Sequence, residues 1–420
     1  MNTQKVAVVG QGYVGLPVAV RAVEVGFDVL GFDTSTEKVD SLNDGVSYID
    51  DITSDDIAEA LATGRYSASA DPASLAGFDV AVITVPTPLH DGAPDMSYVK
   101  SASELVAAHV SPGCLVILES TTYPGTTEEF VAPILEELSG LIAGRDFHLG
   151  FSPERIDPGN TTWTFQKTAK IVAGVDPASL DAVKTFYDAL VDTTVPVAGT
   201  REAEMAKLLE NTFRHVNIAL VNELASQSRA LGIDIWEVIG AAASKPFGFM
   251  PFYPGPGVGG HCLPIDPSYL SWKFERQLGQ PSRFVKIAND VNDHMPDYVV
   301  KRIMLGLNDR GKPAKKSRVL ILGVAYKRDS NDARETPASP IIRQLCELGA
   351  NVRVHDPHIA SYDHDHLITR VDLTVEEVKA ADAVVLVTDH SNVDYEMVVA
   401  HASYVFDTRN KLSGDTVEIL

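Results

Sequence analysis

A glycine pattern close to the N-terminus constrains the fold of this chain most. Residues 5–10 read KVAVVG, an apolar run typical of a buried strand, and the pattern G-x-G-x-x-G occupies residues 10–15 and opens a helical segment. In this setting the first glycine makes a tight turn, the second admits a pyrophosphate, and the third lets the helix pack closely. The pattern predicts a βαβ unit that binds a dinucleotide at the N-terminus of its helix.

An acidic residue completes this pattern. The second strand, residues 27–33 (FDVLGFD), ends at Asp33, where a carboxylate accepts a hydrogen bond from a ribose 2′-hydroxyl and repels a 2′-phosphate. We therefore predict that the cofactor is NAD rather than NADP. A purely structural glycine turn is the alternative. The predicted contacts of the cofactor in this unit are Gly10, Gly12, Tyr13, Val14, Gly15, Asp33 and Lys38.

Strands and helices alternate along most of the chain. Further apolar runs typical of strands lie at residues 80–85, 114–119, 318–323, 351–355 and 383–387, and helical patterns separate them, one of them at 337–348. Such alternation favours parallel sheets with helices on both faces. We predict an α/β fold of two Rossmann-like doubly wound parallel-sheet domains joined by a central helical domain.

One long helix is predicted at residues 201–231. This segment has no proline and no internal glycine, and Gly232 follows it as a helix stop. Its apolar positions recur at spacings of three and four: Ala203, Ala206, Leu209, Phe213, Val216, Leu220 and Leu224. We predict domains at 1–200, 201–312 and 313–420, a linker at 308–317, and a homodimer formed through the long helix.

Composition and charge exclude several partners. The 420 residues carry a formal net charge of −22, which would repel nucleic acid. No apolar run approaches the ~20 residues that span a bilayer, so we predict a cytoplasmic protein without a membrane partner; a salt-rich cytosol is a second explanation of the acidity. The three cysteines, Cys114, Cys262 and Cys346, give neither a disulfide framework nor metal-ligand spacing, and we predict no metal.

Cys262 lies in a loop with an unusual sequence. Residues 253–266 read YPGPGVGGHCLPID, with four glycines before the cysteine and Asp266 four residues after it. Glycines in this number serve backbone freedom or the close approach of a ligand. An inert cysteine in a surface turn is the alternative reading. Lys207 and Asn211 lie one turn apart on the predicted long helix, where a solvated face is the usual explanation.

Eight motifs along nearly the whole chain resemble the UDP-glucose/GDP-mannose dehydrogenase family of nucleotide-sugar 6-dehydrogenases. They occur in the order of the family: GQGYVGLP (10–17), VPTP (85–88), ESTTYPGTT (119–127), SPER (152–155), KLLEN (207–211), GGHCLPIDP (259–267), GVAYKRDSNDARETPA (323–338) and FDTRN (406–410).

The resemblance implies oxidation of the C6 alcohol of a sugar to a carboxylate, with two hydride transfers to two NAD molecules. Cys262 would form a thiohemiacetal and then a thioester that water hydrolyses. Asp266 and Lys207 would move protons and stabilise oxyanions, Asn211 would help to hold the alkoxide or water, and Glu154 and Thr121 would hold water and the sugar. Thr87, Thr121 and Arg334 would contact the cofactor. The implied substrate contacts are Glu154, Arg155, Lys207, Asn211, Tyr253, Gly257, Gly260, Lys327 and Arg409.

Departures from the UDP-glucose enzymes indicate the substrate. Those enzymes carry a lysine where this chain has Ile265 and a small residue where it has His261, and the loop at 245–257 (KPFGFMPFYPGPG) lacks their arginine. These features favour UDP-N-acetylglucosamine, then UDP-N-acetylmannosamine, then UDP-glucose. Two readings of another class stay open: a two-electron hydroxyacid dehydrogenase, which reduces one NAD per substrate, and a non-catalytic sensor of NAD or a nucleotide sugar.

Overall fold

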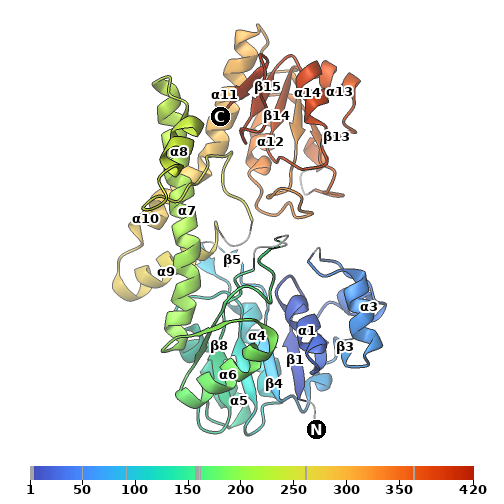
Figure 1. Ribbon diagram of the computed structural model, residues 1–420, viewed down its shortest axis with the longest axis vertical. Helices are drawn as coiled ribbons and strands as arrows, with labels where there is room; N and C mark the ends of the chain where they lie inside the picture. The colour runs from blue at the N-terminus through green and yellow to red at the C-terminus, as the bar shows by residue number, and fades with distance from the viewer. Residues whose placement is uncertain are drawn as a thin grey trace. The chain divides into compact units, whose positions relative to one another are not determined.

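The computed structural model describes residues 4–49, 51–90, 92–156, 160, 162–260, 263–362 and 365–420. Its contacts divide the chain into two compact units (Figure 1). The first unit contains Met1–Glu210 and Ser268–Gln280, and the second contains Asn211–Pro267 and Pro281–Leu420. No helix within the described residues is long and apolar enough to cross a bilayer.

An eight-stranded sheet forms the centre of the first unit, in the order β10-β9-β8-β7-β4-β1-β2-β3. Its strands are β1 (Lys5–Val9), β2 (Asp28–Phe32), β3 (Tyr66–Ser69), β4 (Val80–Ile83), β7 (Leu115–Leu118), β8 (His148–Phe151), β9 (Lys170–Gly174) and β10 (Thr194–Pro196). The four strands that the sequence predicted here are confirmed. All neighbours are parallel except β8 and β9, which are antiparallel.

Both faces of this sheet are covered by helices because each strand sends alternate side chains to opposite faces. On β1, Val6 and Val8 enter one core, whereas Ala7 and Val9 enter the other. The first core contains α1 (Gly15–Glu24), α2 (Thr36–Asn43), α3 (Ser54–Ala62) and α6 (Pro177–Leu190). The second contains α4 (Ser97–Ala107) and α5 (Ala132–Ser139). The first sheet is therefore doubly wound.

A six-stranded parallel sheet forms the centre of the second unit, in the order β13-β12-β11-β14-β15-β16. Its strands are β11 (Arg318–Leu322), β12 (Asn351–His355), β13 (Thr369–Arg370), β14 (Ala383–Leu386), β15 (Val405–Asp407) and β16 (Val417–Ile419). Helices α11 (Met295–Asp309) and α12 (Ala338–Glu347) pack on one face, and α13 (Val375–Ala380) and α14 (Tyr395–His401) on the other. The second predicted doubly wound sheet is confirmed.

The predicted long helix is α7 (Thr200–Ala230), which has 31 residues. The division between the two units falls within it, and α8 (Ile235–Ala243), α9 (Asp266–Leu278) and α10 (Arg283–Asp293) follow. Because α11 ends at Asp309, the connection to β11 is shorter than the predicted linker. The predicted domain boundaries, after residues 200 and 312, remain a prediction. The remaining short elements are 3-10 turns at Pro72–Leu75 and Asp365–Leu367, a π turn at Thr127–Val131, and the pair β5 (Leu89–His90) and β6 (Ala93–Pro94).

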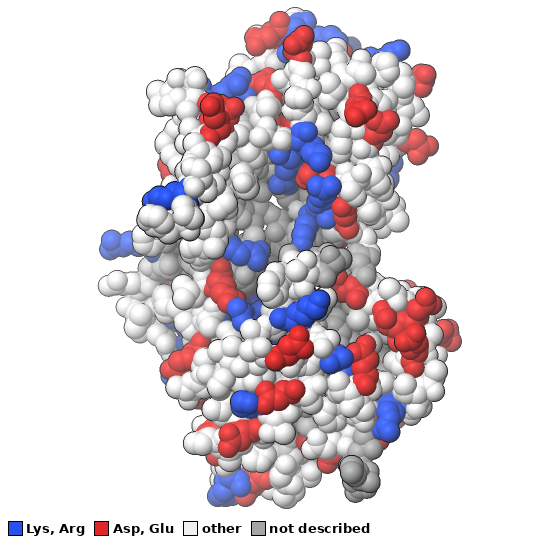
Figure 2. Space-filling view, in the orientation of Figure 1, with Lys and Arg blue, Asp and Glu red and all other residues white. Residues whose placement is uncertain are grey.

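Charged side chains of both signs lie on the face of each unit that Figure 2 shows. The formal net charge of −22 is a sum over the whole chain. An anionic ligand would therefore need a local group of cations.

Candidate active site

The glycine turn after β1 has the geometry that a dinucleotide requires. Gly10 has a φ of +99°, and a Cβ atom there would lie 2.8 Å from the carbonyl oxygen of Thr84. A Cβ on Gly15 would lie 1.9 Å from the carbonyl oxygen of Gly10, so the helix can approach the strand only with glycine at this position. Apart from Gly12 itself and its two chain neighbours, no described residue has an atom within 4 Å of a Cβ built on Gly12. This open space fits a pyrophosphate against the backbone.

The carboxylate of Asp33 is fixed beside this turn. Its Oδ2 accepts from the backbone N–H of Gln11 over 2.9 Å, and its Oδ1 accepts from the N–H of Ser35 over 3.0 Å. The Nζ of Lys38 lies 3.4 Å from Oδ2. The acidic residue is thus held at the end of β2, where the ribose of a bound dinucleotide would lie. These residues fit NAD.

The loops after β4 and β7 are joined at the carboxyl edge of the first sheet. The hydroxyl of Thr87 donates to the carbonyl oxygen of Thr121 over 2.8 Å, and the hydroxyl of Ser120 donates to the carbonyl oxygen of Val85 over 2.8 Å. Strand order reverses between β1 and β4, so the crevice for a ligand opens at this edge. Thr87 and Thr121 are therefore brought to the side of the sheet that carries the glycine turn.

A buried cluster of charges lies at the ends of β7, β8 and β9. Lys170 pairs with Glu119, and its Nζ lies 3.2 Å from Glu154 Oε2; the three side chains are at most 8% exposed. The hydroxyl of Tyr187 donates to Glu119 Oε2 over 2.7 Å. Glu154 also accepts from the N–H of Ile156. Two carboxylates thus share one lysine away from solvent. Because burial strengthens the interactions among these charges, the ionisation of each group depends on the other two.

The charges in this cluster shift one another's pKa. Burial raises the pKa of Glu119 to about 7. Burial alone would also raise the pKa of Glu154, but Lys170 and Lys207 outweigh it and hold this pKa below the ordinary value of a glutamate. The two glutamates in turn raise the pKa of Lys170 against the effect of its own burial. Glu154 is therefore the carboxylate that stays ionised, and the positive charge of Lys207 helps to stabilise it.

Glu119 and Lys170 were not among the residues predicted for the site. Lys170 begins β9, and because β9 runs antiparallel to β8, its first residue lies at the carboxyl end of β8, next to Glu154. The only available signal was that a glutamate in a buried motif needs a cation. Arg155, a predicted substrate contact, pairs with Glu210 over 2.5 Å and donates to the carbonyl oxygen of Ala169 over 2.8 Å.

In the second unit, Asn211 and Asp266 form a buried pair. The amide nitrogen of Asn211 lies 2.7 Å from Asp266 Oδ2, and the two residues are 8% and 3% exposed. Lys207 is equally buried at 8%. The reading of Lys207 and Asn211 as a solvated face is therefore wrong. Asp266 is the first residue of α9, where a carboxylate is favoured by the helix dipole.

The glycine-rich loop packs against the second sheet. A Cβ on Gly259 would lie 2.8 Å from the carbonyl oxygen of Glu335, and one on Gly260 would lie 2.8 Å from the ring of Tyr326. Gly257 and Gly260 have φ values of +134° and +85°, which favour glycine. The loop is therefore shaped by contact with the turn after β11. His261 and Cys262, which follow it, lie outside the described residues.

The remaining predicted contacts also lie in the second unit. Arg409 follows β15; its Nε donates to the carbonyl oxygen of Val387 over 2.7 Å, and its Nη1 lies 3.1 Å from a Cβ built on Gly255. Tyr253 is 54% exposed and stacks on Trp236 with a centroid distance of 5.8 Å. The guanidinium of Arg334 pairs with Asp332 over 2.5 Å. Lys327 lies in the turn after β11, between Tyr326 and Arg328.

The doubly wound sheets and the dinucleotide turn define an NAD-dependent dehydrogenase whose second half is built like its first. Three family models match in order along the chain. They describe the NAD binding domain (residues 4–191), the central domain (201–294) and the UDP binding domain (320–414) of the UDP-glucose/GDP-mannose dehydrogenase family. The chain belongs to this family, and its activity is that of a nucleotide-sugar 6-dehydrogenase.

Relatives with two different substrates are similarly close. A UDP-N-acetyl-D-glucosamine 6-dehydrogenase from Pseudomonas aeruginosa is 37% identical over 397 residues, covering 93% of this chain and 92% of the relative. A UDP-N-acetyl-D-mannosamine dehydrogenase from Pyrococcus horikoshii is 35% identical over 387 residues, covering 92% and 89%. A solved structure of the UDP-D-ManNAc dehydrogenase from Pyrococcus horikoshii has a TM-score of 0.91 at 32% identity and covers 99% of both chains.

Proposed function

We propose that this nucleotide-sugar dehydrogenase oxidises a UDP-N-acetylhexosamine, with UDP-N-acetylglucosamine preferred over UDP-N-acetylmannosamine and UDP-glucose. The observation that carries the proposal is the nearly full-length similarity to enzymes named for the two acetylated sugars, at 37% and 35% identity. The sequence 245–257, with its apolar side chains and without an arginine, supports a site with room for an acetamido group.

NAD, when bound, supplies the hydride acceptor for each of the two oxidation steps. The protein residues would do the rest. A base removes the proton of the C6 hydroxyl as the carbon becomes an aldehyde; the thiolate of Cys262 then adds to that carbon to give a thiohemiacetal. Loss of a second hydride gives a thioester, and water releases the acid and regenerates the thiol. The overall change consumes two NAD and one water for each sugar.

The pair Asn211–Asp266 supports a role in proton transfer. Asp266 is buried and accepts from the Asn211 amide over 2.7 Å, so its carboxylate is held in one orientation. Asp266 also lies only four residues after Cys262 in the sequence, which supports a role for its carboxylate beside the thiol. We propose that Asp266 takes up the alcohol proton and later orients the hydrolytic water, and that Asn211 positions Asp266.

We propose that Glu154 and Lys207 also act at the reacting carbon. Lys207 helps to keep Glu154 ionised, and the same ammonium would stabilise the oxyanion of the thiohemiacetal. An ionised Glu154 would accept a hydrogen bond from the hydrolytic water or a sugar hydroxyl. Lys327 and Arg409 would neutralise the diphosphate of the substrate. Thr87, Thr121, Asp33 and Arg334 would contact the cofactor.

Relative kcat/KM on three sugars tests the substrate proposal. Purified protein is assayed with UDP-N-acetylglucosamine, UDP-N-acetylmannosamine and UDP-glucose, and NADH formation is followed. We expect the first to exceed the second, and UDP-glucose to be slowest by at least about tenfold, since lost contacts to a 2-acetamido group cost on the order of 1–3 kcal/mol. A preference for UDP-glucose would refute the proposed substrate class while leaving the family assignment intact.

We also propose a homodimer through α7. Phe213, Leu220 and Leu224 lie on one face of the helix and are 45%, 51% and 39% exposed, whereas Ala219 and Val221 on the opposite face are buried. A row of apolar side chains exposed along one helix is what a second copy would cover. Leu220→Glu should convert the dimer to a monomer in light scattering. The same change at Leu138, an exposed leucine of α5, serves as the control, and a dimer that survives Leu220→Glu would contradict the proposed interface.

A further inference from the structure

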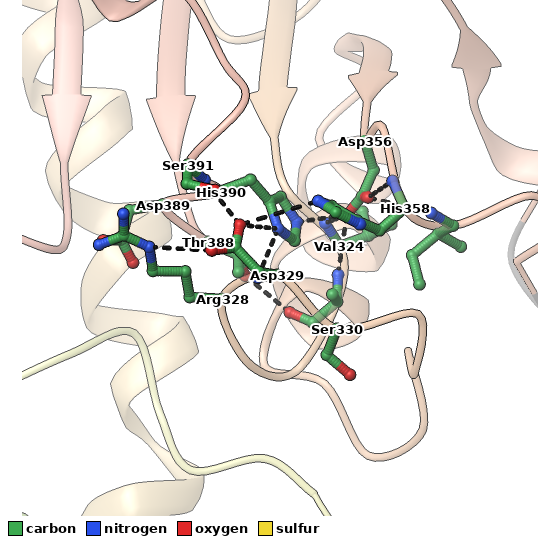
Figure 3. A network of polar contacts seen from close by, with 12 residues as sticks. Val324, Arg328, Asp329, Ser330, Asp356, His358, Thr388, Asp389, His390 and Ser391 are labelled. Carbon is green, nitrogen blue, oxygen red and sulfur yellow. Dashed lines mark hydrogen bonds and ion pairs between the residues drawn. The ribbon is translucent and has the colours of Figure 1, made fainter. Parts of the chain in front are cut away.

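Three side chains that the proposed chemistry does not use meet at the carboxyl edge of the second sheet. Asp329 lies in the loop after β11, His358 follows β12, and His390 follows β14. These strands are neighbours in the order β12-β11-β14, so their carboxyl ends come together. Figure 3 shows the three side chains converging. We call Asp329, His358 and His390 the His–Asp cluster.

The distances within the His–Asp cluster suit a metal ion. Asp329 Oδ1 lies 3.7 Å from His358 Nε2 and 3.8 Å from His390 Nδ1, and the three atoms all lie within 4.8 Å of one another. Ligand atoms around a metal with bonds of about 2.0–2.2 Å are roughly 3.0–3.5 Å apart. The two distances from Asp329 would therefore have to shorten by a few tenths of an ångström, and the two imidazole nitrogens, which lie within 4.8 Å of each other, would have to approach by up to about 1–2 Å. One carboxylate and two imidazoles favour a transition metal over Mg²⁺ or Ca²⁺.

His358 supplies a second observation that points to a ligand. Its Nε2 atom is shielded from solvent and has no hydrogen-bond partner among the described residues. A buried polar atom without a partner costs free energy unless something unseen satisfies it. The side chain as a whole is 29% exposed, so an ion could enter from solvent along this side. In the tautomer that carries its proton on Nδ1, the Nε2 lone pair of His358 is available to a metal, 3.7 Å from Asp329 Oδ1.

His390 is held in the tautomer that a metal needs. Its Nε2 lies 3.1 Å from Asp356 Oδ2, and its Nδ1 accepts from the backbone N–H of Asp329 over 2.9 Å. The carboxylate of Asp356 is itself fixed by the N–H groups of Val324 and Ala325, over 2.7 and 3.0 Å. Nε2 therefore carries the proton and Nδ1 the lone pair, as in metal sites whose histidine is oriented by a carboxylate.

A metal would replace the hydrogen bond from the Asp329 N–H to His390 Nδ1, and it would share Asp329 Oδ1 with the backbone N–H of Ser391, which donates to that atom over 2.6 Å. Asp329 has a φ of +55°, in the left-handed region that an aspartate occupies only at some cost. Movement of this residue on metal binding would therefore relieve strain. Three carboxylates lie around the cluster: Asp356 contacts His390, and Asp329 and Asp389 both pair with Arg328.

We propose that the His–Asp cluster binds one divalent transition metal ion, with Zn²⁺ as the probe. The ion would have three protein ligands, would keep a further position for water, and would tie together the loops after β11, β12 and β14. This inference does not depend on the proposed sugar or on the covalent mechanism. The competing explanation is that hydrogen bonds alone hold the three loops together. This explanation predicts no saturable binding of metal at these residues.

Calorimetric titration of the metal-free full chain with ZnCl₂ tests the proposal. Because the thiol of Cys262 can also bind zinc, the titration is repeated in Cys262→Ser. We expect one site per chain that persists in Cys262→Ser and is weakened at least about 100-fold by His358→Ala. His401→Ala, which removes a histidine of α14 outside the cluster, should leave the affinity unchanged. Asp329→Asn should weaken binding at least about tenfold.

Three results would overturn the metal site. They are equal affinity in His358→Ala and His401→Ala, loss of the site in Cys262→Ser alone, and the absence of saturable binding in the native sequence. Urea unfolding of each metal-free variant shows whether it is folded. Because His358 is partly exposed and its Nε2 makes no hydrogen bond within the described residues, we expect His358→Ala to fold. Zn²⁺ should raise the Tm of the native sequence, of His401→Ala and of Cys262→Ser, but not that of His358→Ala.

Discussion

The amide nitrogen of Asn211 donates to the carboxylate of Asp266 over 2.7 Å in a buried position. This contact ties the long helix α7 to the first residue of α9, directly after the loop that carries Cys262. The cysteine itself lies outside the described residues, but the residue four positions beyond it is fixed. The arrangement makes the Asn211 amide a positioning group for Asp266.

Asn211→Ala should therefore slow the reaction more than it weakens the fold. Asp266 would lose a buried donor, which costs about 1–3 kcal/mol of stability, while kcat should fall at least about 100-fold because the carboxylate is no longer oriented. Steady-state kinetics and urea unfolding measure the two effects. Asn217→Ala is the matched control, since the Asn217 amide donates to the carbonyl oxygen of Phe213 in its own helix. Equal kinetic effects of the two variants would argue against the role of Asn211.

Removal of Lys170 should be among the most costly single changes in the first unit. Lys170→Met leaves Glu119 and Glu154 buried without their shared cation, and breaking a buried pair of this kind costs about 3–5 kcal/mol. The double variant Lys170→Met with Glu119→Gln should regain part of this loss, because one of the two buried charges is gone. Lys184→Met removes an exposed pair with Asp188 and should cost less than about 1 kcal/mol. If urea unfolding gives equal losses in the free energy of unfolding for Lys170→Met and Lys184→Met, the cluster does not contribute to stability in this way.

Asp33→Ala should relax the preference of the enzyme for NAD. The carboxylate that repels a 2′-phosphate would be gone, and the Nζ of Lys38, 3.4 Å from it, would be free to approach that phosphate. The ratio of kcat/KM for NAD over NADP should fall at least about tenfold, an effect of the order of one charge-assisted hydrogen bond. Asp44→Ala, on the loop after α2, is the control. An unchanged ratio in Asp33→Ala would show that the ribose contact is misplaced.

His215 predicts a loss of stability in acid. Burial lowers the pKa of His215 and outweighs the contact of its Nε2 with Asn289 Oδ1 over 2.7 Å, which raises this pKa, so the folded protein favours the neutral imidazole. As pH falls through 6.5, the unfolded chain takes up a proton that the folded chain does not, and the free energy of unfolding decreases. The stability difference between pH 7.5 and 5.5 should therefore be smaller in His215→Gln than in the native sequence. Equal differences would mean that His215 titrates alike in both states.

Much of the fold could be predicted because its signals are local. The strand at 351–355 is an apolar alternation that begins after a glycine-bounded helix, and α7 lacks proline and internal glycine over its whole length. The Rossmann turn at Gly10, Gly12 and Gly15 is a fixed pattern whose physical reasons follow from backbone geometry. In such segments, hydrophobic periodicity and the positions of glycines suffice to predict the type and the extent of the element.

The polar clusters could not be predicted, because they depend on residues distant along the chain. Glu119 and Lys170 are 51 residues apart and meet only because β9 is antiparallel to β8, which no periodicity indicates. The His–Asp cluster joins three loops in the same way. The roles of Cys262, Thr87, Thr121, Arg334 and Arg409 remain predictions, as do the dimer and the cytoplasmic location.

The number of NADH molecules formed per UDP-N-acetylglucosamine consumed distinguishes a four-electron oxidation through Cys262 from a two-electron dehydrogenase reaction. NADH is followed by absorbance while the sugar nucleotide is quantified by chromatography, and Cys262→Ser serves as the variant that lacks the thiol. From the covalent mechanism we expect two NADH per sugar, a uronic acid product without free aldehyde, and no acid in Cys262→Ser. One NADH per sugar, or full acid formation by Cys262→Ser, would contradict it.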